Sequence, residues 1–147
     1  MSNPLLRIIL CGKTTSVGKA VTAGLKPEIE VVRFITSLEA ARKEIPLILS
    51  NQHQNLPQPK PSEEIIGTQN FKVIPDAVML GGGYDASDAQ ILDGENKIPI
   101  FLADRTKPAP PLATGEYGKA ILRRAKDSLL DWEKDTKKGE RNNPIWY

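Results

Sequence analysis

Short apolar runs, separated by polar segments rich in turn-forming residues, are the main pattern along this chain. The runs at residues 5–11 (LLRIILC) and 29–35 (IEVVRFI) are nearly continuous and rich in isoleucine and valine, which is typical of buried strands. Shorter runs predict further strands at residues 46–50 (PLILS), 77–80 (AVML) and 98–103 (IPIFLA). The hydrophobic pattern therefore predicts five strands.

Helical patterns lie between these runs. Val17 begins a short helical stretch that Pro27 closes, and Thr36 or Ser37 can cap a helix that runs to about Lys43. One helical turn is expected at residues 62–67. A further helix is expected from a cap at Asp85 or Ser87 to about Leu92, and Gly94 ends it. A long helix is expected over residues 117–132, where apolar side chains recur every three or four positions.

Strands that alternate with helices predict a parallel sheet covered on both faces. We expect an α/β fold, a three-layer Rossmann-like open parallel sheet of about five strands. Right-handed crossovers leave two strand orders, 3-2-1-4-5 and the flavodoxin-like 2-1-3-4-5. The first is preferred because a short third strand that begins with proline suits the edge of a sheet.

Residues 1–135 are predicted to form a single domain, because the 147 residues of the chain are about the size of one. Residues 51–61 (NQHQNLPQPKP) predict a solvated, proline-rich loop, and residues 107–111 (KPAPP) predict another. Residues 136–147 are expected to form a polar C-terminal tail ending in Ile145, Trp146 and Tyr147. This end either docks on a partner or on a second copy of the chain, or Trp146 and Tyr147 fold back onto their own domain, and folding back is preferred.

Charge and composition exclude several classes of partner. Twenty basic and eighteen acidic residues give a net charge of +2, too weak for a dedicated nucleic-acid-binding protein. No apolar run approaches the roughly 18 residues of a membrane span, so no membrane is expected as a partner. The single cysteine, Cys11, excludes an intrachain disulfide and a multi-cysteine zinc site, and a reducing, cytoplasmic setting is expected.

The ends of the predicted strands carry the candidate binding residues. In an open parallel sheet, ligands bind beyond the carboxyl ends of the strands. We expect a site for a nucleotide or another anionic small molecule, and no metal, at the polar and glycine residues that follow the first, fourth and fifth strands: Gly12, Lys13, Thr14, Thr15, Ser16, Gly18, Gly81, Gly82, Gly83, Asp104 and Arg105. The amides at a helix start and a nearby lysine would attract an anion.

The segment IILCGKTTSVGKAV at residues 8–21 resembles the first strand, turn and helix of NAD(P)-binding Rossmann domains of the short-chain dehydrogenase and NmrA-like type. Gly12 and Gly18 match the first and third glycines of their G-x-x-G-x-x-G turn, and Thr15 stands at the second. The segment PDAVMLGGG also resembles their fourth strand. The resemblance implies NAD or NADP as the cofactor. The family's catalytic Tyr-x-x-x-Lys is absent, because Tyr117 and Lys119 are two positions apart, so its usual hydride transfer is not expected.

Other site types fit these residues less well. A nucleotide triphosphatase loop would need four residues, not five, between Gly12 and Gly18 and a hydroxyl where Ala20 stands. A response-regulator receiver would need an aspartate where glycines follow the fourth strand. Cys11 is expected to be a buried, inert thiol, and His53 an exposed loop residue rather than a ligand.

Two roles from different classes remain. The first is binding of the nucleotide or anionic small molecule at the first strand–helix turn. The second is a non-catalytic interaction or assembly module on the same fold, which self-associates as a homo-oligomer through its aromatic tail. Enzymatic activity with unusual residues is a third hypothesis, for which Lys13, Tyr84, Asp104 and Lys107 are the candidates.

Overall fold

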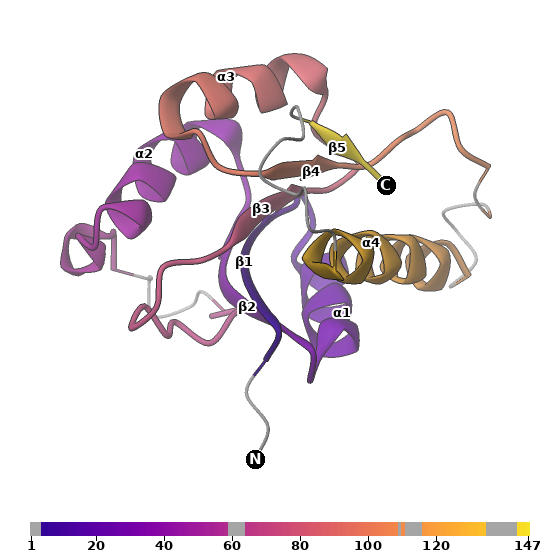
Figure 1. Cartoon of the computed structure of the whole chain (residues 1–147), viewed down its shortest axis with the longest axis horizontal. Coiled ribbons are helices and arrows are strands. Elements are labelled where there is room, and N and C mark those ends of the chain that lie inside the picture. Colours follow the sequence, from indigo (N-terminus) through magenta and orange to yellow (C-terminus); the bar gives the residue numbers. More distant parts are fainter. Residues whose placement is uncertain (1–3, 59–63, 109, 111–115, 135–143) are drawn as a thin grey trace.

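The computed structural model describes residues 4–58, 64–108, 110, 116–134 and 144–147. In this part of the chain, helices cover both faces of one open sheet of five parallel strands (Figure 1). The expected α/β class is confirmed. In chain order the elements are β1 (Leu6–Cys11), α1 (Thr15–Leu25), β2 (Ile29–Ile35), α2 (Leu38–Leu49), the 3₁₀ turn η1 (His53–Asn55), β3 (Ala77–Leu80), α3 (Ala86–Asn96), β4 (Ile100–Leu102), α4 (Glu116–Lys134) and β5 (Ile145–Trp146).

The strands lie in the order β2-β1-β3-β4-β5. Both expected orders counted residues 46–50 as the third strand, but these residues form the end of α2 and its cap. Neither order is therefore right for the five strands that were predicted. The other four predicted strands lie side by side in the sheet in the order that the preferred topology gave them. The fifth strand comes instead from the predicted tail, where Ile145 pairs with Phe101 and Trp146 with Leu102.

Helix α2 runs through the residues for which a strand was predicted. The side chain of Ser37 caps its start, as one of the two expected alternatives, by accepting a hydrogen bond from the Ala40 N–H at 3.1 Å. Ile45 and Ile48 are buried against the sheet at helical spacing. Their burial offsets the backbone hydrogen bond that Pro46 cannot make inside a helix.

Two other helix predictions need correction. Residues 64–66 are not helical, although one turn was expected at residues 62–67, of which 62 and 63 lie outside the described residues. Helix α3 begins after Asp85 as expected, but it passes Gly94 and ends at Asn96. The proline-rich segments are described only in part, since residues 59–61, 109 and 111 also lie outside the described ranges.

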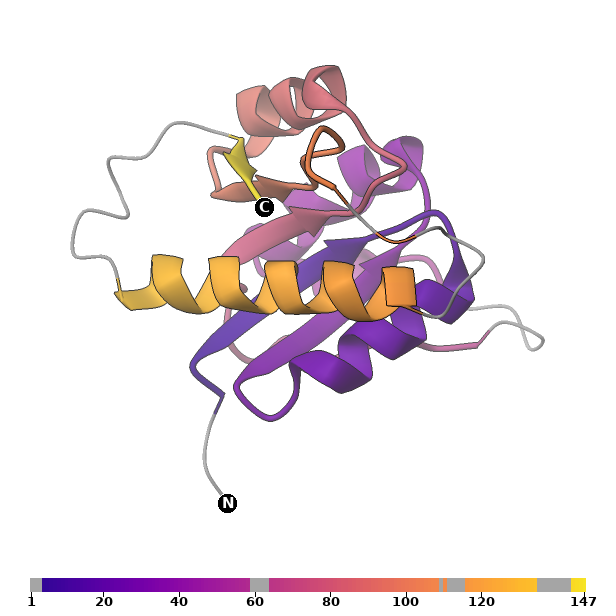
Figure 2. The same cartoon turned by 90° about the vertical axis from the view of Figure 1, so that its right-hand side faces the viewer.

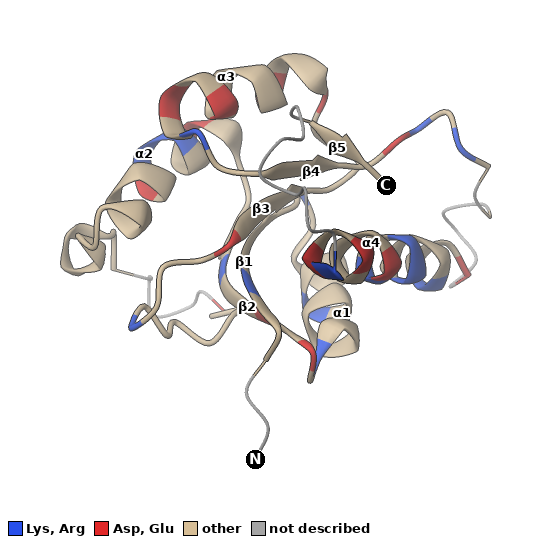
Figure 3. Cartoon of the chain, viewed as in Figure 1, with Lys and Arg blue, Asp and Glu red and all other residues tan. Residues whose placement is uncertain are grey.

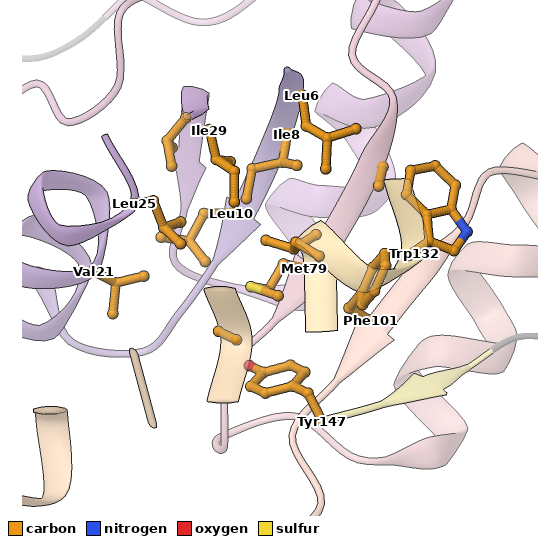
Figure 4. Packing of buried hydrophobic residues seen from close by; sticks show 14 of the residues in the cluster. Leu6, Ile8, Leu10, Val21, Leu25, Ile29, Met79, Phe101, Trp132 and Tyr147 are labelled. Carbon is orange, nitrogen blue, oxygen red and sulfur yellow. The ribbon is translucent and has the colours of Figure 1, made fainter. Parts of the chain in front are cut away.

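Two hydrophobic cores lie on opposite faces of the sheet. Helices α1 and α4 cover one face, and α2 and α3 cover the other (Figures 1 and 2). In the first core, the ring of Trp132 on α4 meets that of Phe101 edge to face, with centroids 5.7 Å apart (Figure 4). Because side chains alternate along β1, Leu10 faces this core and Cys11 faces the other.

The last residues of the chain complete the sheet and the first core. Ile145 and Tyr147 are buried there, and Figure 4 shows the Tyr147 ring in this core. The Tyr147 hydroxyl donates a hydrogen bond to the Leu80 carbonyl at 2.7 Å. Trp146 lies between them on the opposite face of the sheet and is 48% exposed. The two aromatic side chains of the tail therefore have different surroundings.

A β-bulge in β2 decides which side chains face each core. The register between β1 and β2 shifts between Ile8 and Ile9, which leaves Val32 as the extra residue. Beyond the bulge, Arg33 reaches the α2 side, whereas Phe34 packs against the core under α1. The bulge thus re-aims the last part of β2 next to the carboxyl edge of the sheet.

Candidate functional site

The turns that follow β1 and β3 meet at the carboxyl edge of the sheet, as the sequence predicted. The N–H of Gly81 donates to the Cys11 carbonyl at 2.9 Å, and the N–H of Gly12 donates to the Ile35 carbonyl at 2.9 Å. These bonds bring the glycines after β3 beside the start of the turn that leads into α1. Gly12 and Gly81 are therefore neighbours.

The two glycines of the dinucleotide-like turn contact a side chain of this chain itself. A Cβ on Gly18 would lie 2.5 Å from the ring of Phe34, and one on Gly12 would lie 3.1 Å from it. Either distance is shorter than the usual separation of non-bonded carbon atoms. Both glycines make room for the Phe34 ring, which the bulge in β2 directs toward them.

The side chain of Lys13 packs across the glycines after β3. A Cβ on Gly83 would come within 2.3 Å of Lys13 Cγ, and the ammonium of Lys13 lies 4.3 Å from the centroid of the Tyr84 ring. Gly82 has the hydroxyl of Tyr117 beside it, 3.5 Å from where its Cβ would be. Side chains of the protein thus fill much of the space between these two turns.

The buried Cys11 thiol lies below this turn. Burial raises its pKa from 9.0 to about 12; the charge of Glu44 acts in the same direction and that of Lys13 opposes it. The thiol is therefore protonated at neutral pH, and a protonated thiol is a poor nucleophile.

Asp104 and Arg105, which follow β4, lie in a pocket of their own. The carboxylate of Asp104 accepts hydrogen bonds from Thr106, and Arg105 donates to the Tyr84 carbonyl at 3.3 Å. The pocket, called here the β4 pocket, has a volume of about 460 Å³. It is lined by Tyr84, Asp85, Ala86, Leu102, Ala103, Asp104, Arg105, Thr106, Lys107 and Trp146.

A larger hollow lies at the carboxyl end of β2, between the first turn of α1, α2, η1 and residues 64–71. This hollow, called here the β2 cleft, has a volume of about 710 Å³. Thr15 is the predicted site residue that it contains. It is lined by Thr15, Arg33, Phe34, Ile35, Thr36, Ala40, Glu44, His53, Leu56, Pro57, Gln58, Glu64, Ile65, Ile66, Gln69 and Phe71.

A nearly buried polar group lies in the wall of the β2 cleft. Arg33 Nε donates to Glu44 Oε1 at 2.8 Å, and its Nη1 donates to Gln69 Oε1 at 2.9 Å. The side chains of the ion pair are 16% and 10% exposed, so both charges interact through a medium less polar than water. This cluster, called here the Arg33 group, fixes the guanidinium beside the cleft.

Gly67 allows Gln69 to reach this group. Its backbone is left-handed (φ 97°), and a Cβ there would lie 2.8 Å from the Val32 carbonyl oxygen, so only glycine fits without strain. The close approach lets the N–H groups of Thr68 and Gln69 donate to the Val31 and Val32 carbonyls, each at 2.9 Å.

His53 forms part of another wall of the cleft. Its ring stacks on that of Phe71, with centroids 5.2 Å apart and an interplanar angle of 18°. His53 is exposed, as the sequence predicted, yet it lines the β2 cleft. Two aromatic rings, one from η1 near the start of the proline-rich loop and one from a segment that follows this loop, thus meet at this wall.

Sequence reasoning missed the Arg33 group. Two signals were present: an arginine inside the apolar run of β2, and Glu44 within the buried helical stripe of Ala41, Ile45 and Ile48. A charged residue that lies on an apolar face needs a partner, and these two are partners.

The fold and its hollows define an open parallel α/β protein with a cleft at the carboxyl ends of its strands. The chain is 31% identical over 129 residues to Kojic acid related protein 6 of Aspergillus oryzae. The matched region covers 83% of this chain and 74% of that protein. The chain belongs to the same family as that protein. No family model and no solved structure matches this chain significantly.

Two findings concern the partners considered from the sequence. No helix in the described ranges is both long and apolar enough to cross a membrane. Helix α4 carries both basic and acidic residues (Figure 3), so this long helix has mixed charge.

Proposed function

We propose that the chain binds a small anionic molecule in the β2 cleft, with the anionic group at the start of α1. One observation carries the proposal: a single cleft joins Thr15, the first residue of α1, to the Arg33 group. Its volume of about 710 Å³ falls within the range of about 300–1,000 Å³ that is usual for small-molecule sites.

The first turn of α1 favours a negative charge. The N–H groups at a helix start lack partners within the helix and form the positive end of its dipole. The Thr14 side chain makes no capping hydrogen bond, and no acidic residue lies in the first turn. A carboxylate or phosphate that enters the cleft beside Thr15 would accept hydrogen bonds that the helix leaves open.

The acidic residues of the cleft do not oppose this binding strongly, because each is paired with a cation. Glu44 is paired with Arg33, and Glu64 with Lys19 at 2.6 Å. The Thr15 and Thr36 hydroxyls add donors, while Leu56, Ile66 and Phe71 supply apolar contact area. Polar groups therefore orient the ligand and apolar groups bury it.

Nucleotides, including NAD and NADP, belong to this ligand class. The resemblance of the turn to NAD(P)-binding domains supports including them, with the ligand displaced toward β2 because Phe34 and Lys13 occupy the turn itself. The name of the fungal relative associates that protein with kojic acid, which is a reason to test this compound too.

A cytoplasmic location belongs to the same proposal and is supported by the single, buried cysteine.

Thermal unfolding of the full chain with separate additions of ATP, NAD, NADP, inorganic phosphate and kojic acid tests the proposal. A ligand at 100 times its Kd stabilises a protein by about 2.7 kcal/mol, which raises the Tm of a domain of this size by several degrees. We expect at least one anionic compound of this panel to do so.

Matched variants test the location. Ala40→Leu on α2 fills part of the cleft, whereas Ala23→Leu adds the same side chain at an exposed position of α1. The first variant should lose the ligand-induced rise in Tm and the second should keep it. Binding to none of the five compounds, or an equal rise in both variants, would contradict the proposal.

Self-association through residues 145–147 has weaker support. Ile145 and Tyr147 lie in the core of this chain, so Trp146 is the member of the trio with a large exposed area. An aromatic side chain on one short edge strand is a small surface compared with the roughly 800 Å² that each partner contributes to a standard interface.

A further inference from the structure

A second binding site lies at the other side of the same sheet edge. We propose that the β4 pocket binds a planar aromatic anion, whose ring stacks on Trp146 and whose anionic group binds Arg105 and Lys107. The pocket shares no lining residue with the β2 cleft, so this inference does not depend on the function proposed above.

Trp146 supplies a flat apolar wall. It pairs with Leu102 across β4 and β5, and therefore points to the α3 side of the sheet, where Ala86 lines the same pocket. Its neighbours Ile145 and Tyr147 are buried on the other side and hold the strand in place. The indole is thus fixed by its backbone yet 48% exposed, which suits stacking against an aromatic ring.

Arg105 supplies an oriented cation. Among the described residues, its guanidinium makes one hydrogen bond, to the Tyr84 carbonyl at 3.3 Å. That bond directs the side chain toward the pocket and leaves donors open to a carboxylate or phosphate, which guanidinium groups bind in a planar, two-pronged geometry. Lys107 lines the same pocket and adds a second positive charge.

The two carboxylates of the pocket are already engaged by their own loops. Asp85 accepts hydrogen bonds from the Ser87 hydroxyl at 2.6 Å and from the Asp88 N–H at 3.0 Å. Asp104 accepts from the Thr106 hydroxyl at 2.6 Å and from its N–H at 3.0 Å. These bonds all go to one oxygen of each carboxylate, and the charge of Arg105 adds to the Ser87 hydrogen bond in lowering the pKa of Asp85. The two negative and two positive charges of the pocket balance, so binding of an anion depends on the open guanidinium donors of Arg105 rather than on net charge.

These groups define the ligand by two features together. A neutral ring would leave the open guanidinium donors without an acceptor on the ligand, and a small inorganic anion would leave the indole without a stacking partner. Nicotinate combines a planar ring with a carboxylate. Nicotinamide has the same ring without the charge, so the pair separates the contribution of the anionic group.

Tryptophan fluorescence of the full chain measures the binding, because the chain has two tryptophans and Trp132 is buried. We expect nicotinate to change the emission in a saturable way, with nicotinamide and inorganic phosphate having much weaker effects. Arg105→Gln should weaken nicotinate binding about tenfold or more, as expected for loss of a charge-assisted hydrogen bond. Trp146→Phe should abolish the fluorescence change.

Arg42→Gln is the matched control, since Arg42 lies on α2 and pairs with Glu95 outside the pocket. It should bind nicotinate like the unmodified chain. Equal effects of nicotinate and nicotinamide, an emission change that does not saturate, or unchanged affinity in Arg105→Gln would each overturn the proposal. None of these outcomes depends on the β2 cleft, which Ala40→Leu tests separately.

Discussion

At the scale of single residues, Phe34 accounts for two glycines that looked like part of a nucleotide-binding turn. Its ring lies against Gly12 and Gly18, at positions where any Cβ would press on it. A glycine motif read from sequence says only that something approaches the backbone closely. Here that neighbour is an aromatic side chain of the same domain, brought there by a bulge in the next strand.

Gly18→Ala should lower the free energy of unfolding by about 1–3 kcal/mol, because the new methyl group overlaps the Phe34 ring. The better helix propensity of alanine returns at most about 1 kcal/mol. Gly94→Ala is the control, since no described residue lies within 4 Å of its Cβ position in α3, and it should be neutral or stabilising. Urea unfolding measures both; a stable Gly18→Ala variant would show that the ring yields freely.

At the scale of elements, the sequence predicted what local pattern determines. The first two strands and the long last helix follow from runs of apolar residues and from helical spacing. Capping side chains narrow the starts of α2 and α3 to two candidates each, of which Ser37 and Asp85 form the caps. The segment 46–50 could not be assigned in this way, because a short apolar run fits a strand or the end of a buried helix equally well. Packing of Ile45 and Ile48 decides for the helix.

The candidate sites were only partly predictable for a related reason. That polar turns gather at the carboxyl edge follows from parallel strands alone, and Thr15, Asp104 and Arg105 do line hollows there. The Arg33 group depends on a bulge and on a loop segment that lies far away in sequence. Neither the bulge nor the loop contact has a local sequence pattern, so the Arg33 group could not be found from any single segment of the sequence.

The cap of α3 should give this element a stability that depends on pH. Hydrogen bonds from the Ser87 hydroxyl, and then from the Asp88 N–H, hold the pKa of Asp85 below its ordinary value of 3.8. A carboxylate with a lowered pKa stabilises the folded state fully above its ordinary value, and this stabilisation is lost as the pH falls through the folded-state value.

Asp85→Ala should therefore have a lower Tm than the unmodified chain near neutral pH, and the gap should narrow in acid. Asp85→Asn is the matched control, because asparagine still caps a helix but does not titrate. It should keep most of the neutral-pH stability without the acid dependence. A gap that is independent of pH for Asp85→Ala would contradict the role of the ionised cap.

At the scale of the whole molecule, the sheet is assembled from distant parts of the chain. Its last strand comes from residues 145–146, and Tyr147 reaches across to the Leu80 carbonyl on β3. Arg124 on α4 donates to the carbonyls of Asp104 and Tyr147, which ties that helix to the same corner. The C-terminal residues thus fasten α4, β3 and β4 together.

Tyr147→Phe should lower the free energy of unfolding by about 1–3 kcal/mol, since it removes one buried hydrogen bond and leaves the Leu80 carbonyl without that donor. Tyr117→Phe is a suitable comparison, because Tyr117 is only partly buried on α4. Its effect should be smaller. Equal destabilisation of the two variants in urea would argue against a special role for the Tyr147 hydroxyl.

The close contact that Gly67 permits also bears on the behaviour of this protein at high concentration. An edge strand with unpaired backbone N–H and C=O groups can pair with strands from other molecules and start fibre growth. Along β2, the carbonyls of Val31 and Val32 already receive the N–H groups of Thr68 and Gln69, and at the opposite border β5 is only two residues long. Both edges of the sheet are thus poor templates for the addition of a strand from another molecule.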